Sequence, residues 1–291
     1  MTLPETLRTA LEACLGGVIR RVVPVGGGCI AQSCRIETTR GAYFLKWGSE
    51  AVADTFAAEA RGLAALRSAQ QALVIPEVIA VAAARSDCPG FLVLEWVEPG
   101  QPGKRFWENF GEGLAQLHRS VGSRYGFDQD NFIGRLPQDN RWEEDWITFF
   151  WQHRILPQVQ GARQRGCWEA TWDQWLDRLE ARLPELLPRH PPASLLHGDL
   201  WSGNFMVTAD GRAALLDPAV YYGDRETDLA MTTLFGGFDP RFYAAYQAAW
   251  PLEPGYTERQ ALYNLYHLLN HLNHFGQSYA PAVARTLRRF A

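Results

Sequence analysis

The sequence predicts an α+β chain with two lobes: a small lobe built on a five-stranded antiparallel sheet with one helix, and a larger, mainly helical lobe. Three observations predict this architecture. Most strand-like runs lie in the first third of the 291 residues. Two prolines and two glycines at residues 99–103 are typical of a linker. After this linker, apolar residues recur mainly at helical spacing. We therefore expect the lobes at residues 1–97 and 98–291.

The first lobe begins with a predicted helix over residues 5–15, which ends at Gly16-Gly17. A second helix is expected over residues 50–69, where Ala, Leu and Glu dominate. Turn signals rich in glycine separate the strand-like runs around these helices. The five strands of the sheet are expected at residues 18–25, 30–38, 42–47, 78–84 and 91–97.

The second lobe is predicted to be mainly helical, with a few short strands around its polar motifs. Its helices are expected at residues 104–120, 141–160, 168–187 and 259–274. Its short strands are expected at residues 195–196, 205–207 and 213–216.

Composition excludes several classes of protein. Apolar types make up 47% and charged types 21%, as in ordinary globular proteins. A net charge of −4 gives no basic field to attract nucleic acid. The longest apolar stretch, residues 73–84, is interrupted by Pro76 and Glu77 and is too short to cross a membrane. Five cysteines without a CxxC pair, and no signal-peptide pattern, predict a reducing, cytoplasmic setting.

The segment HGDLWSGN, residues 197–204, carries the main chemical prediction. It places Asp199 five residues before Asn204, and Asp217 follows at the end of an apolar strand. A phosphoryl-transfer site needs one carboxylate to orient the substrate hydroxyl and accept its proton. It also needs an amide oxygen and a second carboxylate to hold Mg²⁺ against the nucleotide phosphates. This spacing is that of the catalytic and metal loops of protein-kinase-like enzymes. The alternative is that these side chains cap turns.

Lys46 is the second anchor of the predicted site. The chain has only two lysines among its 28 Lys and Arg residues, and Lys46 lies within the strand-like run YFLKW. A compact ammonium can reach phosphate oxygens as a point charge. Glu59, inside the predicted helix 50–69, is the favoured partner for an ion pair, with Glu50 and Asp54 as rivals. A solvated lysine on an edge strand is the alternative.

Other residues are expected to complete the nucleotide site. Gly27 and Gly28 follow the first strand, where backbone N–H groups could approach phosphates. Taken alone these glycines favour a plain hairpin turn, and the phosphate-binding interpretation gains weight only because Lys46 follows at the right distance. The backbone of residues Leu94, Glu95 and Trp96 could hydrogen-bond an adenine.

Three further positions are given supporting or structural roles. Asp228 is expected to support the catalytic loop by bonding its backbone or His197. His118 is expected to be a packed helix residue rather than a ligand. Three histidines at near-helical spacing (His267, His271 and His274) are expected to form a packed polar face rather than a metal site.

Taken together, these motifs resemble the fructosamine kinases (ketosamine kinases), in the aminoglycoside-phosphotransferase and choline-kinase branch of the protein-kinase-like fold. The resemblance covers nearly the whole chain. HGD and DP mark the broad fold, whereas LWSGN, YYGDRETDLAM and the DNFIG…DW…FF stretch are specific to this family. The motifs that carry it are GGGCIAQS (26–33), Lys46, FAAEARGL (56–63), YGFDQDNFIG (125–134), RWEEDWITFF (141–150), HGDLWSGN (197–204) and LLDPAVYYGDRETDLAMTTLFGGF (215–238).

The resemblance implies ATP-dependent phosphorylation of the third-carbon hydroxyl of a ketosamine, such as a fructosamine or ribulosamine. That phosphate makes the adduct decompose and frees the amine of a protein or small molecule. Carried over by position, Asp199 is the proton acceptor and Asn204 with Asp217 binds Mg²⁺. Lys46 and Glu59 form the ion pair, and residues 94–96 form the adenine hinge. Ala31 departs from the asparagine that family members often have there.

Two residues have open alternatives. Trp201 is expected either to lie on the sugar or the amine-bearing chain, or to be a core residue beneath the loop. Cys29 is either a small buried residue or a thiol whose oxidation links two copies, an idea that the resemblance suggests. The expected assembly is therefore a monomer or a redox-sensitive homodimer.

Two other functions remain open at the level of the sequence. A kinase for an aminoglycoside or choline would share the site but favour a strongly acidic pocket for its cationic substrate. A nucleotide-binding pseudokinase module would be expected to lack one of the four residues Lys46, Asp199, Asn204 and Asp217, and all four are present.

Overall fold

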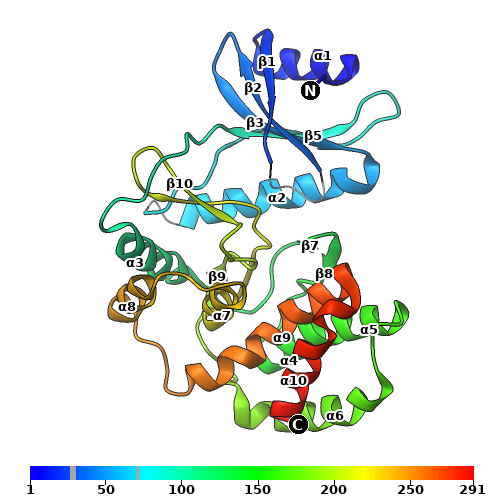
Figure 1. The fold of residues 1–291 in the computed structure, drawn as a ribbon, viewed down its shortest axis with the longest axis vertical. Coiled ribbons are helices and arrows are strands. Elements are labelled where there is room, and N and C mark those ends of the chain that lie inside the picture. The colour runs from blue at the N-terminus through cyan, green and yellow to red at the C-terminus, as the bar shows by residue number, and fades with distance from the viewer. Residues whose placement is uncertain (27–30, 70–71) are drawn as a thin grey trace. The chain divides into compact units, whose positions relative to one another are not determined.

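The computed structural model describes residues 1–26, 31–69 and 72–291 (Figure 1). It divides into two compact units. The first comprises Met1–Phe106 with Gly203–Pro218, and the second comprises Trp107–Ser202 with Ala219–Ala291. No helix within the described ranges has both the length and the apolar character needed to cross a membrane.

The first unit contains the expected five-stranded antiparallel sheet. Its strand order is β1-β2-β3-β5-β4. Residues facing the α1 side of the sheet, such as Ile36 and Leu45, are fully buried. The strands are β1 (Ile19–Pro24), β2 (Gln32–Thr38), β3 (Ala42–Gly48), β4 (Val78–Ala82) and β5 (Gly90–Glu95).

Two helices accompany this sheet. Helix α1 (Glu5–Leu15) ends at Gly16, which adopts a left-handed conformation, and buries Leu7 and Leu11 in the core. Helix α2 (Glu50–Ala69) packs against β3, β4 and β5. Its buried side is rich in alanine, which lets the helix approach the sheet closely and keeps helix propensity high. The predicted bounds of both helices are confirmed.

A hairpin from late in the sequence also belongs to the first unit. Strands β10 (Phe205–Val207) and β11 (Ala213–Leu215) pair with each other. Val74 joins them through hydrogen bonds with Ala213 and Leu215, and the N–H of Gly100 donates to the carbonyl of Val207. A side chain at Gly100 would collide with the carbonyl of Thr208. This unit therefore differs from the expected lobe 1–97: it extends to Phe106 and takes in residues 203–218.

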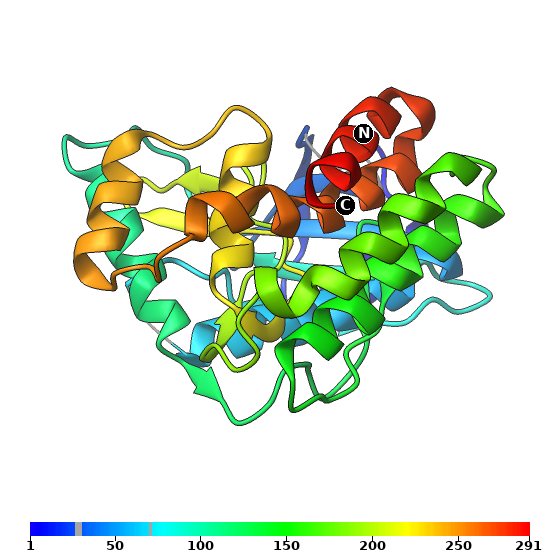
Figure 2. The ribbon, with the colours of Figure 1, turned by 90° about the horizontal axis from the view of Figure 1, so that it is seen from below.

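The second unit is mainly helical, and α9 lies at its centre. Every residue of α9 from Leu262 to Asn270 is buried, and the helix packs against α5, α7 and α10 (Figure 2). Its helices are α3 (Phe106–His118), α4 (Trp146–Phe150), η1 (Trp151–Ile155), α5 (Leu156–Gln164), η2 (Ala170–Trp172), α6 (Asp173–Leu186), α7 (Glu226–Leu234), α8 (Pro240–Ala249), α9 (Tyr256–Phe275), η3 (Gly276–Tyr279) and α10 (Ala280–Phe290).

The helix expected over residues 141–160 differs in detail from the prediction. It begins at Trp146, because the carboxylate of Asp145 accepts the N–H of Thr148 and caps the helix. Residues Trp151–Ile155 then form a π-helical turn before α5 continues to Gln164. Such a turn shifts the register of the side chains, and here the adjacent His153 and Arg154 are both buried.

Short strands complete the second unit. Strand β9 (Ala193–Leu196) lies between β12 (Tyr221–Asp224) and β6 (Val121–Gly122) in a three-stranded sheet. A separate hairpin pairs β7 (Asn131–Ile133) with β8 (Leu136–Gln138). The sequence analysis did not predict β6, β7, β8 or β12, because segments of two to four residues carry too few positions to show alternation.

Candidate active site

Lys46 forms the charged centre of the first unit. Its Nζ lies 2.8 and 2.9 Å from the two carboxylate oxygens of Glu59 and 2.5 Å from Oδ1 of Asp217. The side chains of Lys46 and Glu59 are mostly buried, whereas that of Asp217 is half exposed. Burial alone would lower the pKa of Lys46, but the two carboxylates raise it above its usual value. The ammonium is therefore held charged and in a fixed position.

The β10–β11 hairpin brings Asn204 and Asp217 to one end of two paired strands. Asn204 directly precedes β10, and Asp217 follows β11 by two positions. The N–H of Leu216 donates to the carbonyl of Asn204 at 2.9 Å, which extends the pairing by one step. Thirteen residues of sequence separation are thus closed by a hairpin, and Asn204 lies beside the residue that precedes Asp217.

The backbone at Asp217 is strained. Among the described residues, Asp217 is the non-glycine residue with positive φ, at 53°. It also precedes Pro218, which restricts its conformation further. Strained positions persist where the surroundings determine them strongly, and they concentrate at functional sites. In this conformation the Asp217 carboxylate contacts Lys46.

In the second unit, Asp228 holds the loop that contains Asp199. The Asp228 carboxylate accepts the N–H of His197 at 2.7 Å and the N–H of Gly198 at 2.8 Å. The N–H of Asp199 in turn donates to Nδ1 of His197 at 3.3 Å. All of these contacts except those of Asp199 lie in the interior. The structure therefore shows that the Asp228 carboxylate bonds the backbone of this loop, and that the His197 ring bonds the Asp199 N–H.

His118 forms a buried hydrogen bond with the Asp228 carboxylate. Its Nε2 lies 3.2 Å from Oδ2 of Asp228, and its Nδ1 lies 2.8 Å from the Tyr246 hydroxyl. Burial lowers the pKa of His118, and burial would raise that of Asp228. The hydrogen bond with His118 and the backbone N–H donors nevertheless hold the pKa of Asp228 below its usual value. Sequence reasoning gave His118 a packing role and missed this contact, which joins positions 110 residues apart.

Gly198 is required by the shape of the same loop. Its φ is +82°, and a Cβ placed there would lie 2.0 Å from the carbonyl oxygen of Ala219. The N–H of Ala219 donates to the carbonyl of His197 at 2.9 Å. The loop that contains Asp199 therefore runs against the segment that follows the DP motif, without room for a side chain at Gly198.

Gln138 and Asn131 hold the same segment through its carbonyl groups. The Gln138 amide donates to Oδ1 of Asn131 at 2.7 Å and to the carbonyl of Ala219 at 3.1 Å, and it accepts the Tyr266 hydroxyl at 2.6 Å. Asn131 donates to the carbonyl of Val220 at 2.8 Å. Sequence reasoning did not assign these residues. The available signal was the DNFIG stretch, which includes Asn131.

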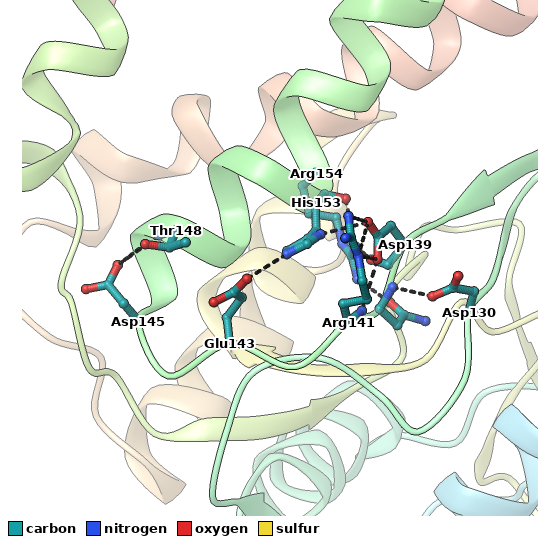
Figure 3. A network of polar contacts seen from close by, with 9 residues as sticks. Asp130, Asp139, Arg141, Glu143, Asp145, Thr148, His153 and Arg154 are labelled. Atoms are coloured by element: carbon teal, nitrogen blue, oxygen red, sulfur yellow. Dashed lines mark hydrogen bonds and ion pairs between the residues drawn. The ribbon is translucent and has the colours of Figure 1, made fainter.

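A second polar network orders the loop between β8 and α4 (Figure 3). His153 lies between two carboxylates, 2.9 Å from Asp139 and 3.1 Å from Glu143. Arg154, which is fully buried, donates to the carbonyl of Asp139 at 2.6 Å and to Oδ1 of Asn140 at 2.7 Å. The π-helical turn thus directs two neighbouring side chains into one loop. This loop begins directly after Gln138, the last residue of β8.

The expected adenine hinge occupies the end of β5. Leu94 is buried, and the N–H of Glu95 donates to the carbonyl of Glu77 at 2.8 Å. The Glu95 side chain accepts the N–H of Glu77 at 3.2 Å. Trp96 donates from its indole N–H to Glu98 at 2.7 Å. Because the Glu95 N–H is engaged within the sheet, donors for an adenine are better sought in the residues after β5.

The structure places Trp201 partly at the surface, in contact with the ring of Phe235. Its side chain is 36% exposed, so it is not a core residue. It makes an edge contact with the Phe235 ring, with 5.9 Å between ring centroids. Gly27 and Gly28, considered for phosphate binding, and Cys29, considered either as a small buried residue or as a redox-active thiol, lie outside the described residues.

The side-chain oxygens of Asn204 and Asp217, both in the first unit, suit Mg²⁺. Among the described residues, no three His, Cys, Asp or Glu side chains gather into a metal cage. Asn204 and Asp217 offer amide and carboxylate oxygens, which are the donors that Mg²⁺ prefers. Mg²⁺ is commonly bound by one or two side chains, with water and substrate phosphates completing its shell. The chemistry of this pair therefore fits the ion.

Comparisons of sequence identify relatives over almost the whole chain. A sequence model of the family described as fructosamine kinase matches residues 6–291. A "Probable ketoamine kinase" of Lactiplantibacillus plantarum is 41% identical over 273 residues, which cover 94% of this chain and 95% of that protein. A chloroplastic protein-ribulosamine 3-kinase of Oryza sativa subsp. indica is 36% identical, covering 91% of this chain and 77% of that protein.

Comparisons of structure agree. A candidate fructosamine-3-kinase of Thermobifida fusca YX-ER1 superposes with a TM-score of 0.88 at 30% identity, covering 99% of both chains. A thermostable mutant of an aminoglycoside phosphotransferase, solved with AMP-PNP and hygromycin B, has a TM-score of 0.63 at 17% identity, covering 98% of both chains. This second likeness shows the fold alone and confirms the expected protein-kinase-like class. The resemblance seen in the sequence is likewise confirmed, and the chain belongs to the fructosamine kinase family.

Proposed function

We propose that this protein is an ATP-dependent kinase that phosphorylates the third-carbon hydroxyl of ketosamines. The observation that carries the proposal is the family match over residues 6–291, with named ketoamine and ribulosamine kinases among the relatives. The chain also retains Lys46, Asp199, Asn204 and Asp217. The class of reaction therefore rests on relatives and on residues together.

Lys46 is proposed to bind the α- and β-phosphates of ATP. Its ammonium is kept charged by Glu59 and Asp217, and Glu59 accepts two hydrogen bonds from it. A compact, charged donor in a fixed position stabilises phosphate oxygens without reorganising during the reaction. Backbone groups at Gly27 and Gly28 and around residues 94–96 are proposed to contact the phosphates and the adenine.

Asn204 and Asp217 are proposed to hold Mg²⁺ through their side-chain oxygens. When bound, Mg²⁺ neutralises part of the negative charge of the transferred phosphoryl group. The hairpin pairing at Asn204 and the strained backbone at Asp217 keep both oxygens in place before the nucleotide arrives. Asp217 also contacts Lys46, so the two charges that face the phosphates are set relative to each other.

Asp199 is proposed to orient the third-carbon hydroxyl and to accept its proton. The hydroxyl oxygen forms a bond to the γ-phosphorus as the bond from that phosphorus to the bridging oxygen breaks, and ADP leaves. Asp228 and His118 keep the loop in position from behind. Trp201 is proposed to lie against the sugar face. The resulting 3-phosphate makes the adduct decompose, which frees the amine.

The test is phosphorylation by the purified protein with ATP and Mg²⁺. The substrates are a fructosamine, a ribulosamine, an aminoglycoside and choline, with Asp199→Asn as the matched inactive variant. The proposal expects turnover of the two ketosamines, a product phosphorylated at the third carbon, and a loss of kcat of about 10²–10⁴-fold in the variant. Turnover of choline or the aminoglycoside instead would assign another substrate, and nucleotide binding without any turnover would contradict an enzyme.

A further inference from the structure

Five aromatic side chains of the second unit form a continuous row that starts two residues after Asp199. We call Trp201, Phe235, His271, Phe275 and Tyr279 the ring row. Ring centroids are 5.9 Å apart for Trp201 and Phe235, and 4.7 Å apart for Phe235 and His271. From His271 the row continues to Phe275 at 5.5 Å and to Tyr279 at 5.0 Å. These distances are those of aromatic rings in direct contact.

The ring row is largely open to solvent at both ends. Phe275 is 59% exposed and Trp201 is 36% exposed. The rings of Phe235, His271 and Tyr279 are partly buried. Isolated exposed apolar residues are common, but a connected set of rings that reaches solvent at both ends is a candidate binding surface. Burial lowers the pKa of His271, so its imidazole is neutral near pH 7. The row therefore carries no formal charge along its length.

Helix α9 relates the ring row to Asp199. The pKa of Tyr266 is raised chiefly by burial, and the Asp199 carboxylate adds to this shift, so Asp199 lies within Coulombic reach of that hydroxyl. His271 follows Tyr266 by five residues on the same helix, a rise of about 7.5 Å. Tyr279 ends η3, which follows α9 directly and leads into α10 (Figure 1, orange to red). The more direct link is Trp201, which lies two residues after Asp199 and contacts Phe235, so the ring row begins beside the proposed base.

The substrate has a matching dimension. In a ketosamine, the third-carbon oxygen and the amine nitrogen are separated by four bonds of about 1.5 Å, which span at most about 5 Å. The group carried by the nitrogen therefore begins near that distance from the reacting hydroxyl and extends away from it. A substituent that leaves Asp199 past Trp201 would reach Phe235 next, and then His271 and Phe275.

We propose that the ring row binds the substituent on the ketosamine nitrogen and selects adducts in which this substituent is apolar. The inference rests on the proposed function, and it assigns substrate specificity to Phe235, His271, Phe275 and Tyr279. Flat, uncharged rings give such a group a surface to cover, and they offer nothing to offset the desolvation of a carboxylate.

The experiment compares two fructose adducts that differ only in this group, one made from benzylamine and one from methylamine. The wild-type protein is expected to have a KM about tenfold lower for the benzyl adduct, from the apolar area that it covers. Phe275→Ser removes the most exposed ring of the row and is unlike a core change, so the fold is retained. It should raise KM for the benzyl adduct several-fold, with kcat and the methyl adduct unchanged.

Trp142→Ser is the matched control. Trp142 is also 36% exposed and lies in the same unit, but its ring neighbour is Tyr222 and not the ring row. This variant should keep the wild-type ratio of the two KM values. Equal KM values in the wild type, or an equal rise for both adducts in Phe275→Ser, would overturn the inference and leave the proposed function standing. No turnover of either adduct would overturn the proposed function, and this inference with it.

Discussion

The carboxylate of Asp228 accepts the backbone N–H of His197 at 2.7 Å, and its other oxygen accepts the next N–H along the loop. One buried side chain thus sets the path of the loop that carries Asp199. The contact spans 31 positions of sequence, so it is made only when α7 and β9 have both been placed.

Asp228→Asn tests this arrangement. An amide has one acceptor oxygen, so one loop N–H loses its partner and the Asp199 carboxylate is held less firmly. We expect kcat to fall about 10- to 100-fold, with little change in KM for ATP. Steady-state kinetics for both substrates measure this, and Asp210→Asn, at an exposed turn, is the control. A rise in KM for ATP at unchanged kcat would contradict a role through the loop.

Gly198→Ala should inactivate the protein. The added Cβ would meet the carbonyl of Ala219 at 2.0 Å, and the left-handed φ adds strain. We expect a loss of kcat of at least 10²-fold together with a lower Tm. Gly166→Ala is the matched control, because its φ is +67° and no heavy atom lies within 4 Å of the new Cβ. Gly166→Ala introduces a side chain at a left-handed φ without a collision. Similar activity losses in the two variants would therefore argue against the collision at Gly198 as the cause.

Lys46→Met should weaken use of ATP. The change removes the ammonium that we propose binds the ATP phosphates, and it leaves the mostly buried Glu59 without this partner. We expect kcat/KM for ATP to fall about 10²–10³-fold. Lys104→Met, the change of the other lysine, should have kcat/KM within about twofold of the wild type. Because an unpaired Glu59 also destabilises the fold, Lys46→Met with Glu59→Gln separates the two effects: Tm should recover and activity should not.

Gln138→Leu should destabilise the second unit. The substitution leaves the carbonyl of Ala219 and the Tyr266 hydroxyl in the interior without this partner. The free energy of unfolding should fall by about 2 kcal/mol or more, since each orphaned polar group costs about 1–3 kcal/mol. Denaturant titration measures this, and Gln152→Leu at an exposed position is the control. Equal midpoints for the two variants would show that the Gln138 amide contributes little.

The buried carboxyl of Asp224 predicts a pH dependence of stability. Burial, and then the negative charge of Glu226, raise the pKa of Asp224 to about 6. Because this value lies above that of the unfolded chain, the neutral form favours folding, and its contribution is lost as the pH rises through about 6. The free-energy difference between wild type and Asp224→Asn should shift toward the wild type by about 1 kcal/mol from pH 7 to pH 5. A difference independent of pH would contradict the raised pKa.

Much of the fold was predictable because it is encoded locally. The predicted bounds of α2 agree with the structure to the residue, since its alanine, leucine and glutamate residues favour a helix whatever surrounds them. The turn glycines likewise marked where α1 and the early strands end. The short strands β6 and β12 could not be predicted, because their extended conformation comes from pairing with β9 and not from their own residues.

The sequence by itself determined which chemical groups the protein has. The spacing of Asp199, Asn204 and Asp217 indicated a phosphoryl-transfer site, and Lys46 is one of only two lysines in a chain rich in arginine. The tertiary structure decided which groups meet. It brought Asp217 to Lys46 across 171 positions and His118 to Asp228 across 110. It also joined residues 203–218 to the first unit and brought the rings of Phe235 and His271 into contact. Spacing along the chain reports only local geometry. Contacts between distant residues, such as Lys46 with Asp217 and His118 with Asp228, form when helices and strands pack together and bury apolar side chains away from water.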